Sequence, residues 1–354
     1  MKTIYVKPWN GCNLRCDFCY NAQMENSTKM TDVVLARTLE YIHNLSKNPN
    51  NHPLLVHLHG GEPMLYREDW LLDFCKTVRS FGCILTCTTN LTYSLTKGKK
   101  EILSLMTPRF GKPFFQTSYD VGTTRFKTET DRRQFFDNLN DLRGDGFNIQ
   151  TTFCVTNELV DGFEGMKKLF SIFGNFVNFE RLTLNGNLLK HQSLIPSFEK
   201  IDEFFLRIWI EYVECKRTNP SCHVAILDDL VFSVLNPYRW VGCRNRTCSD
   251  DVLTIEPDGS IGTCPNVSYK TVGYLAEIPI EFVDKKNDLI REERQQKLAC
   301  LTCDVFSVCH GDCYQIQSQD KERCCGLPRT IRAMQKTLGE NPEIKSLFEE
   351  GVIA

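Results

Sequence analysis

The sequence predicts an α/β fold, a partial (β/α)6 barrel followed by a small cysteine-rich domain. Over residues 1–218, strand-like apolar runs alternate with helix-like stretches. The chain also holds 18 cysteines in 354 residues, many of them in its last third. Strict alternation of strand and helix favours parallel strands joined by crossover helices, and a change of rhythm after about residue 219 marks a second module.

Six strand and helix units support this fold. Apolar alternation and breaker residues place the strands at residues 3–8, 54–59, 83–89, 113–118, 147–155 and 176–184. The helix-like stretches are residues 31–45, 70–79, 100–106, 132–142, 165–173 and 198–215, the first opened by the capping candidate Thr31. We therefore expect a barrel domain at residues 1–218, a linker at 219–242, a cysteine-rich domain at 243–325 and a C-terminal helical segment at 326–354.

The charge balance and the N-terminus limit the classes of function. Forty-two Lys and Arg residues oppose 44 Asp and Glu residues, so no strong field points to nucleic acid or to an acidic membrane surface. We see no secretion signal and no apolar run near the roughly 20 residues that span a bilayer. Without export, many cysteines favour bound metal over disulfide bonds, so we expect a cytoplasmic metalloprotein.

The first metal motif follows the first expected strand. Cys12, Cys16 and Cys19 have the spacing CxxxCxxC. Three thiolates on so short a loop can each bind one iron of a cubane 4Fe-4S cluster, which leaves the fourth iron open to another ligand. Structural zinc normally takes four protein ligands, and no fourth cysteine or histidine lies near this loop. The motif therefore favours an iron-sulfur cluster with a vacant position.

With Phe18 just before the third cysteine, this motif resembles the radical S-adenosylmethionine (radical SAM) superfamily. The resemblance implies that the open iron chelates the amino and carboxylate groups of S-adenosylmethionine. It also implies that an electron from the cluster cleaves this cofactor to a 5′-deoxyadenosyl radical, which abstracts hydrogen from an unactivated C–H bond. In a partial barrel, the loop after the first strand lies at the C-terminal rim, which is where barrel enzymes place their chemistry.

A second motif, Gly60-Gly61-Glu62-Pro63, ends the second strand and is similar to the GGEP motif of that superfamily. Glycines allow close approach of the backbone, and Glu62 can accept a hydrogen bond from a cationic amine. The resemblance extends the cofactor site to Asn90 after the third strand, to Ser118 and Asp120 at the end of the fourth, and to Arg125, for which Arg132 and Arg133 are alternatives.

The cysteines of the last third resemble the SPASM domain, which in some proteins holds two auxiliary 4Fe-4S clusters. By position, the resemblance assigns Cys243, Cys248, Cys264 and Cys313 to the first auxiliary cluster, and Cys300, Cys303, Cys309 and either Cys324 or Cys325 to the second. Eight thiolates fill both clusters, so electron transfer is the role that this implies. Structural zinc is the alternative for these cysteines.

SPASM proteins of this build mostly modify peptides, so the resemblance implies a maturase of a ribosomally synthesised precursor peptide. The preferred reaction is an intramolecular cross-link, either carbon-carbon (cyclophane) or thioether, with an electron donor such as flavodoxin or ferredoxin. The base that assists it is one of Asp120, Asp250, Asp251 and Asp312. No leader-binding domain precedes Cys12, so we expect the body of the enzyme or a separate protein to recognise any leader.

Three alternatives remain. The first is a maturase of a small-molecule substrate, such as a sugar or an amino acid. Another is an anaerobic sulfatase-type maturase that oxidises cysteine or serine to formylglycine. Those enzymes typically have an aspartate directly after the third SPASM cysteine, whereas Pro265 follows Cys264 here, which disfavours that reaction. The third is a non-catalytic metal-binding interaction protein, which would neither cleave S-adenosylmethionine nor depend on Glu62.

Overall fold

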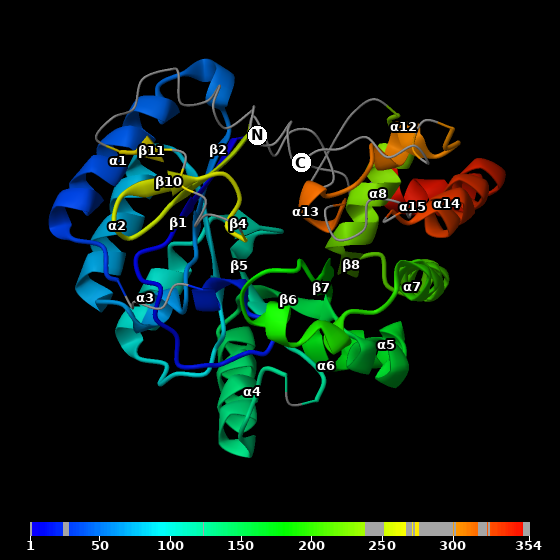
Figure 1. The fold of residues 1–354 in the computed structure, drawn as a ribbon, viewed down its shortest axis with the longest axis horizontal. Coiled ribbons are helices and arrows are strands. Elements are labelled where there is room, and N and C mark those ends of the chain that lie inside the picture. The colour runs from blue at the N-terminus through cyan, green and yellow to red at the C-terminus, as the bar shows by residue number, and fades with distance from the viewer. Residues whose placement is uncertain are drawn as a thin grey trace. The chain divides into compact units, whose positions relative to one another are not determined.

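The computed structural model of the protein describes residues 2–23, 28–122, 124–237, 251–266, 271, 273–275, 300, 302–317, 324 and 326–349 (Figure 1). The chain forms two compact units. The first contains residues 1–150, 185–190 and 249–289, and the second contains residues 151–184, 191–248 and 290–354. Within the described ranges, every helix is too short or too polar to cross a lipid bilayer.

The first unit contains a mainly parallel sheet with the strand order β11-β10-β9-β1-β2-β3-β5. Strands β9, β1, β2, β3 and β5 run parallel, whereas β10 and β11 continue the sheet antiparallel and β4 forms a hairpin with β5. The strands are β1 (Lys2–Val6), β2 (Leu54–Leu58), β3 (Ile84–Thr89), β4 (Pro108–Arg109), β5 (Lys112–Ser118), β9 (Val252–Ile255), β10 (Ser260–Gly262) and β11 (Gly273–Tyr274).

Helices follow most of the parallel strands of this unit, and Figure 1 shows α1, α2 and α3 along one side of β1 and β2. Side chains of the preceding residue cap α1 and α4, where Thr31 accepts from the N–H of Val34 and Thr128 from that of Asp131. The helices are α1 (Asp32–Ser46), α2 (Glu68–Ser80), α3 (Lys97–Ser104) and α4 (Glu129–Gly144), with the 3-10 turns η1 (Tyr20–Gln23), η2 (Pro49–Asn51), η3 (Pro63–Leu65) and η4 (Gly186–Lys190).

The register of the parallel strands brings their carboxyl ends to one edge of the sheet. Val6, the last residue of β1, is paired with Leu58 of β2 and with Ile255 of β9. Further along the sheet, Thr89 at the end of β3 is paired with Thr117 of β5. The segments that follow these strands therefore lie at the same edge, which is where open α/β folds place their ligands.

The second unit contains the parallel strands β6, β7 and β8 and a core of aromatic side chains. Phe179 of β7 packs edge-on against Phe204 of α7, and Asp202 of α7 accepts hydrogen bonds from the first N–H groups of α14. The elements are β6 (Asn148–Val155, which begins in the first unit), α5 (Asn157–Gly162), α6 (Met166–Phe173), β7 (Phe176–Arg181), η5 (Gln192–Leu194), α7 (Phe198–Thr218), β8 (His223–Val224), α8 (Ala225–Leu235), α12 (Phe306–Cys309), α13 (Tyr314–Gln317), α14 (Pro328–Glu340) and α15 (Pro342–Glu349).

The predicted α/β class is confirmed, because all six expected strands are present as β1, β2, β3, β5, β6 and β7 and helices alternate with them. Three features differ from the expected elements. A separate short helix, α5, precedes the one expected at residues 165–173. Residues 225–235, expected within a linker, form α8. Strand β9, far along the chain, pairs in parallel with β1.

Candidate active site

The loop that carries the first three cysteines, residues 11–20, is here called the cysteine loop. Cys16 is buried, whereas Cys12 and Cys19 are partly exposed. Backbone hydrogen bonds fix the loop, since the N–H of Asp17 donates to the carbonyl oxygen of Thr124 at 2.9 Å and the N–H of Cys19 to that of Cys16 at 3.2 Å. The three thiols therefore lie on a short and well-braced segment.

The turn η4 also braces the cysteine loop, which the sequence analysis did not anticipate. Asn187 donates from its backbone N–H to Cys19 O at 3.0 Å and from its side chain to Cys16 O at 2.9 Å. Gly186 has a φ of 57°, and a Cβ on it would lie 2.2 Å from Cys19 O. Only glycine therefore fits beside the loop at this position, and an isolated Gly-Asn pair gave no local signal of that role.

Burial controls the protonation of these thiols. Burial raises the pKa of Cys12 to about 11, with a smaller effect of the Glu62 carboxylate in the same direction. Burial likewise raises the pKa of Cys16 to about 12, against the influence of Arg125, which lowers it. Since thiolates rather than thiols bind iron, metal loading must release protons from these side chains.

The donor set fits a cubane cluster. Cys19 contributes to the raised pKa of both Cys12 and Cys16, so the three thiols lie within electrostatic range of one another. Throughout the described ranges, no three His, Cys, Asp or Glu side chains converge to hold a single metal ion. A cubane does not require such convergence, because each thiolate binds a different iron. The backbone N–H of Leu14 also lies 3.4 Å from the Cys12 sulfur, where it can donate a hydrogen bond to a thiolate.

The Gly60–Glu62 turn packs directly against the chain that enters the cysteine loop. The N–H of Gly61 donates to Trp9 O at 3.0 Å, and the N–H of Glu62 donates to Gly11 O at 2.9 Å. A Cβ on Gly61 would lie 2.1 Å from Gly11 O, so no larger residue fits there. The two motifs, which are 40 or more positions apart in the sequence, therefore form one structure, as the parallel register of β1 and β2 requires.

Glu62 is almost fully buried, with 1% of its surface exposed. Its Oε1 accepts hydrogen bonds from Met64 N at 2.9 Å and Thr89 Oγ1 at 2.8 Å, and its Oε2 accepts one from Asn90 N at 2.6 Å. These bonds take three of the roughly four acceptor positions of a carboxylate. Burial raises the pKa of Glu62 to about 7, against these bonds, which lower it. A cationic amine would favour the ionised form here.

Asn90 connects this carboxylate to the cysteine loop. Its side-chain amide lies 3.6 Å from the Cys12 sulfur and donates to Asn13 Oδ1 at 2.8 Å. Asn13 in turn donates to Thr92 O at 2.7 Å. The end of β3 is thus bonded both to Glu62 and to the first cysteine, as its position at the carboxyl edge of the sheet allows.

The end of β5 supplies a second polar group beside the cysteine loop. Ser118 is the last residue of β5, and Asp120, just beyond it, forms an ion pair with Arg125 at 2.5 Å. The Arg125 guanidinium lies 5.4 Å from the centre of the Phe18 ring and is buried, unlike an ordinary surface arginine. Arg132 instead donates to Gly122 O at 3.0 Å. Arg125 therefore lies against the cysteine loop, as the resemblance requires of a residue of the cofactor site.

Four of the C-terminal cysteines line one cavity in the second unit, together with Phe306 and Gly326. They are Cys300, Cys303, Cys309 and Cys324. A Cβ on Gly326 would lie 2.7 Å from the Cys309 sulfur and 3.8 Å from that of Cys324, so the absence of a side chain keeps this space open. The donor chemistry of four thiols around one apolar cavity fits a fully ligated cluster.

The remaining predicted site residues that the structure describes belong to both units. Cys264 follows β10 in the first unit, and Cys313 precedes α13 in the second. Asp312 is completely buried, forms an ion pair with Arg181 and accepts from Cys313 N at 2.6 Å, whereas Asp251 is partly exposed beside β9. Four predicted residues lie outside the described ranges: Cys243, Cys248, Asp250 and Cys325.

Comparison with known proteins gives a family match for the first part of the chain. Residues 6–169 match the profile of the Radical SAM superfamily. Over 78 residues, the chain is 40% identical to 7-carboxy-7-deazaguanine synthase from Bacteroides thetaiotaomicron, a match that takes in 22% of this chain and 37% of that protein. The chain thus spans little more than a third of the curated relative that it matches.

Solved structures resemble the chain over nearly its whole length. Native anSMEcpe with bound AdoMet and Kp18Cys peptide gives a TM-score of 0.78 at 17% identity, covering 98% of this chain and 99% of that one. Streptococcus suis SuiB bound to precursor peptide SuiA gives a TM-score of 0.60 at 17% identity, covering 90% and 73%. At these identities the likeness establishes a shared fold.

Proposed function

We propose that this chain, whose residues 6–169 form a radical SAM domain, is a maturase that cross-links side chains within a ribosomally synthesised peptide. The observation that carries the proposal is the joining of the cysteine loop to Glu62. Asn90 lies beside Cys12 and bonds to Glu62, so the ligands expected for iron and those expected for S-adenosylmethionine form one connected site. A non-catalytic metal protein has no need of the residues expected to bind S-adenosylmethionine.

Cys12, Cys16 and Cys19 would hold the catalytic 4Fe-4S cluster. Together with S-adenosylmethionine, that cluster supplies the radical that removes hydrogen from the substrate. The cofactor would lie against the Gly60–Pro63 turn, with its ammonium group at Glu62 and its polar groups near Asn90, Ser118 and Asp120. Arg125, which is paired with Asp120, would contact the carboxylate of the cofactor.

We place the second auxiliary cluster in the cavity lined by Cys300, Cys303, Cys309 and Cys324. Forming a new bond between two side chains after hydrogen abstraction leaves one electron to be removed, and a fully ligated cluster can accept it. For the first auxiliary cluster, expected at Cys243, Cys248, Cys264 and Cys313, the support is the sequence pattern. Flavodoxin or ferredoxin would exchange electrons with the enzyme.

A peptide substrate is supported by the bound molecules of the similar structures. The anSMEcpe structure holds the Kp18Cys peptide, and SuiB holds its precursor peptide SuiA. A base is needed where the cross-link releases a proton. Among the predicted candidates, Asp120 is paired with Arg125 and Asp312 with Arg181, and both aspartates are buried.

The first test is cleavage of S-adenosylmethionine by the anaerobically reconstituted chain with a chemical reductant. We expect 5′-deoxyadenosine to form, and to be lost in Cys16→Ala. Cys75→Ala is the matched control, because Cys75 is a buried thiol of α2 outside the proposed site. A wild-type chain that binds iron and S-adenosylmethionine but never forms 5′-deoxyadenosine would contradict the proposal.

The second test separates cross-linking from formylglycine formation. A candidate precursor peptide encoded beside the gene is co-produced with the enzyme and analysed by mass spectrometry. A cross-link removes two hydrogens and ties two residues together in the fragment spectrum, whereas formylglycine formation changes a single cysteine or serine. Pro265, in place of an aspartate after Cys264, favours the first outcome.

A further inference from the structure

We propose that Lys7 and Glu256 act as positioning residues that hold the two ends of the cysteine loop in the geometry needed for S-adenosylmethionine cleavage. Together with Asn10 and Asn21 they are here called the clamp. The inference rests on the proposed function, because it assumes that the cysteine loop holds the catalytic cluster.

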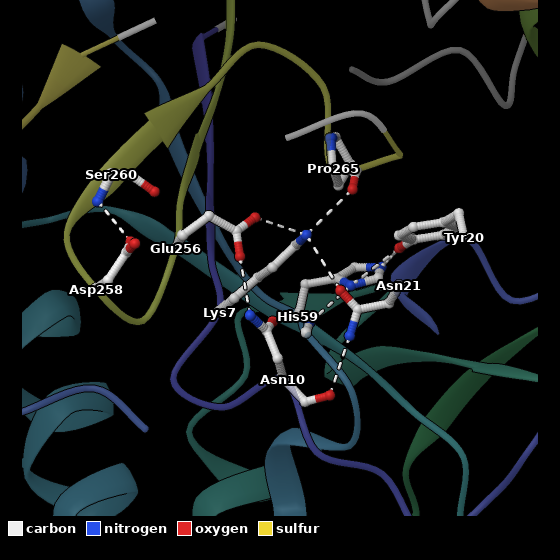
Figure 2. A network of polar contacts seen from close by, with 10 residues as sticks. Lys7, Asn10, Tyr20, Asn21, His59, Glu256, Asp258, Ser260 and Pro265 are labelled. Atoms are coloured by element: carbon white, nitrogen blue, oxygen red, sulfur yellow. Dashed lines mark hydrogen bonds and ion pairs between the residues drawn. The ribbon is translucent and has the colours of Figure 1, made fainter. Parts of the chain in front are cut away.

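The centre of the clamp is a buried ion pair. The Lys7 ammonium lies 2.8 Å from Glu256 Oε1, and the two side chains are 2% and 1% exposed. A buried pair is stable only where further hydrogen bonds satisfy the remaining donors and acceptors. Here those partners come from the residues that flank the cysteine loop (Figure 2).

Asn10 lies just before the loop and Asn21 just after it. Glu256 Oε2 accepts from the Asn10 side chain at 3.2 Å, and Lys7 donates to Asn21 Oδ1 at 3.5 Å. The Asn21 side chain then donates to Asn10 O at 3.1 Å, which closes the base of the loop. Both ends of the segment that carries the three thiols are thus fixed to one charged pair, as Figure 2 shows.

The same ammonium reaches two further parts of the first unit. Lys7 donates to the carbonyl oxygen of Pro265, which follows Cys264, at 3.1 Å. It also lies 5.9 Å from the centre of the Tyr20 ring, whose hydroxyl is 3.1 Å from a ring nitrogen of His59. His59 immediately precedes Gly60, so Tyr20 links the clamp to the turn that would bind the cofactor.

Glu256 lies outside residues 6–169, which match the superfamily profile. It reaches Asn10, 246 positions earlier, because β9 pairs in parallel with β1 and ends beside Lys7. The backbone N–H of Lys7 donates to Ile255 O at 2.9 Å, so the hydrogen bonds between β1 and β9 continue as far as the ion pair. The radical SAM site is therefore completed by a residue from the C-terminal part of the chain.

The test compares Glu256→Gln with wild type in the anaerobically reconstituted full-length protein. Some residues orient the metal ligands without binding the metal themselves, and replacing them typically lowers activity about 10- to 100-fold. We therefore expect a loss of that size in 5′-deoxyadenosine formation. We also expect an altered electron paramagnetic resonance spectrum of the reduced cluster with S-adenosylmethionine bound. The matched control is Glu101→Gln, which breaks an exposed pair with Lys76.

A second variant separates positioning from stability. Lys7→Met/Glu256→Met leaves no unpaired buried charge, and such replacements often preserve or raise stability. We expect its thermal unfolding to match wild type while its spectrum with S-adenosylmethionine stays altered. A wild-type spectrum in either variant would overturn the clamp. If the wild-type chain assembles the cluster but does not cleave S-adenosylmethionine, the proposed function fails. The comparison of the variant spectra with the wild-type spectrum still tests whether the clamp positions the cysteine loop.

Discussion

The side-chain amide of Asn90 lies 3.6 Å from the sulfur of Cys12, while its backbone N–H donates to Glu62 at 2.6 Å. One residue at the end of β3 thus contacts both the first thiol and the buried carboxylate. A hydrogen-bond donor to a cluster thiolate stabilises the reduced state of the cluster, which carries more negative charge. Such a donor therefore raises the reduction potential of the cluster.

Asn90→Ala should leave the catalytic cluster assembled but reduce its function. The variant loses the amide near Cys12 and the bond to Asn13, while the backbone bond to Glu62 remains. We expect 5′-deoxyadenosine formation to fall about 10- to 100-fold and the midpoint potential of the catalytic cluster to become more negative. Asn148→Ala, which removes a bond to Arg109 O far from the loop, should change neither. An unchanged potential in Asn90→Ala would contradict this role.

Gly326→Ala should exclude the second auxiliary cluster. The added Cβ would lie 2.7 Å from the Cys309 sulfur, closer than real side chains tolerate. We expect the iron content of the reconstituted protein to fall by about four atoms per chain, one cubane, with the catalytic cluster retained. Gly339→Ala in α14 is the control, because its Cβ meets nothing within 4 Å; it should stabilise the helix by about 0.5–1 kcal/mol. Full iron content in Gly326→Ala would rule out this site.

Cys324, which lines the cavity, should be the fourth ligand of the same cluster. Cys324→Ala therefore removes one of four thiolates, and we expect loss of the second auxiliary cluster or its conversion to a form with fewer irons. Cys325→Ala is the matched control and should keep the full iron content. Mössbauer spectra of iron-57 protein distinguish the two variants, and the reverse result would exchange the roles of these cysteines.

The stability of the protein should depend on pH through His57. Burial lowers the pKa of His57 to about 3, whereas an unfolded histidine titrates near about 6.5. Between these values the unfolded chain binds one proton more than the folded chain, so the free energy of unfolding falls as the pH falls below about 6.5, by up to ~1.4 kcal/mol per pH unit.

His57→Gln should remove this contribution. We expect the difference in urea unfolding free energy between pH 7 and pH 5.5 to be smaller in His57→Gln than in wild type. His191→Gln, at an exposed position of the second unit, should keep the wild-type dependence. Equal dependence in wild type and His57→Gln would show that His57 titrates normally in the folded chain.

Much of the first unit could be predicted from local patterns. Apolar alternation located β1, β2 and β3, and Thr31 was correctly expected to cap α1. The proximity of Glu62 to the cysteine loop followed from the order of parallel strands. These predictions succeed because each depends on residues within one strand, one helix or one crossover.

Other features have no local signature. The pairing of β9 with β1, and with it the contact between Asn10 and Glu256, joins residues 246 positions apart. Asn187 braces the cysteine loop through one backbone and one side-chain hydrogen bond, and Gly186 leaves room for the close approach, but a Gly-Asn pair carries no local signal of this role. Helix α8 lies in a segment that was expected to be a linker, because the regular alternation of strands and helices in the sequence ends after about residue 219. Tertiary contacts decide each of these features.

The pairing of β1 with β9 also has a consequence for biogenesis. During synthesis, β1 and the cysteine loop leave the ribosome long before residues 252–255, so one edge of β1 stays open until the C-terminal part of the chain is made. The Lys7 ammonium likewise gains its counter-ion only once Glu256 has emerged. The final setting of the cysteine loop therefore forms only after residues 252–256 have left the ribosome, and a chain that ends before residue 252 lacks the strand that pairs with this edge of β1.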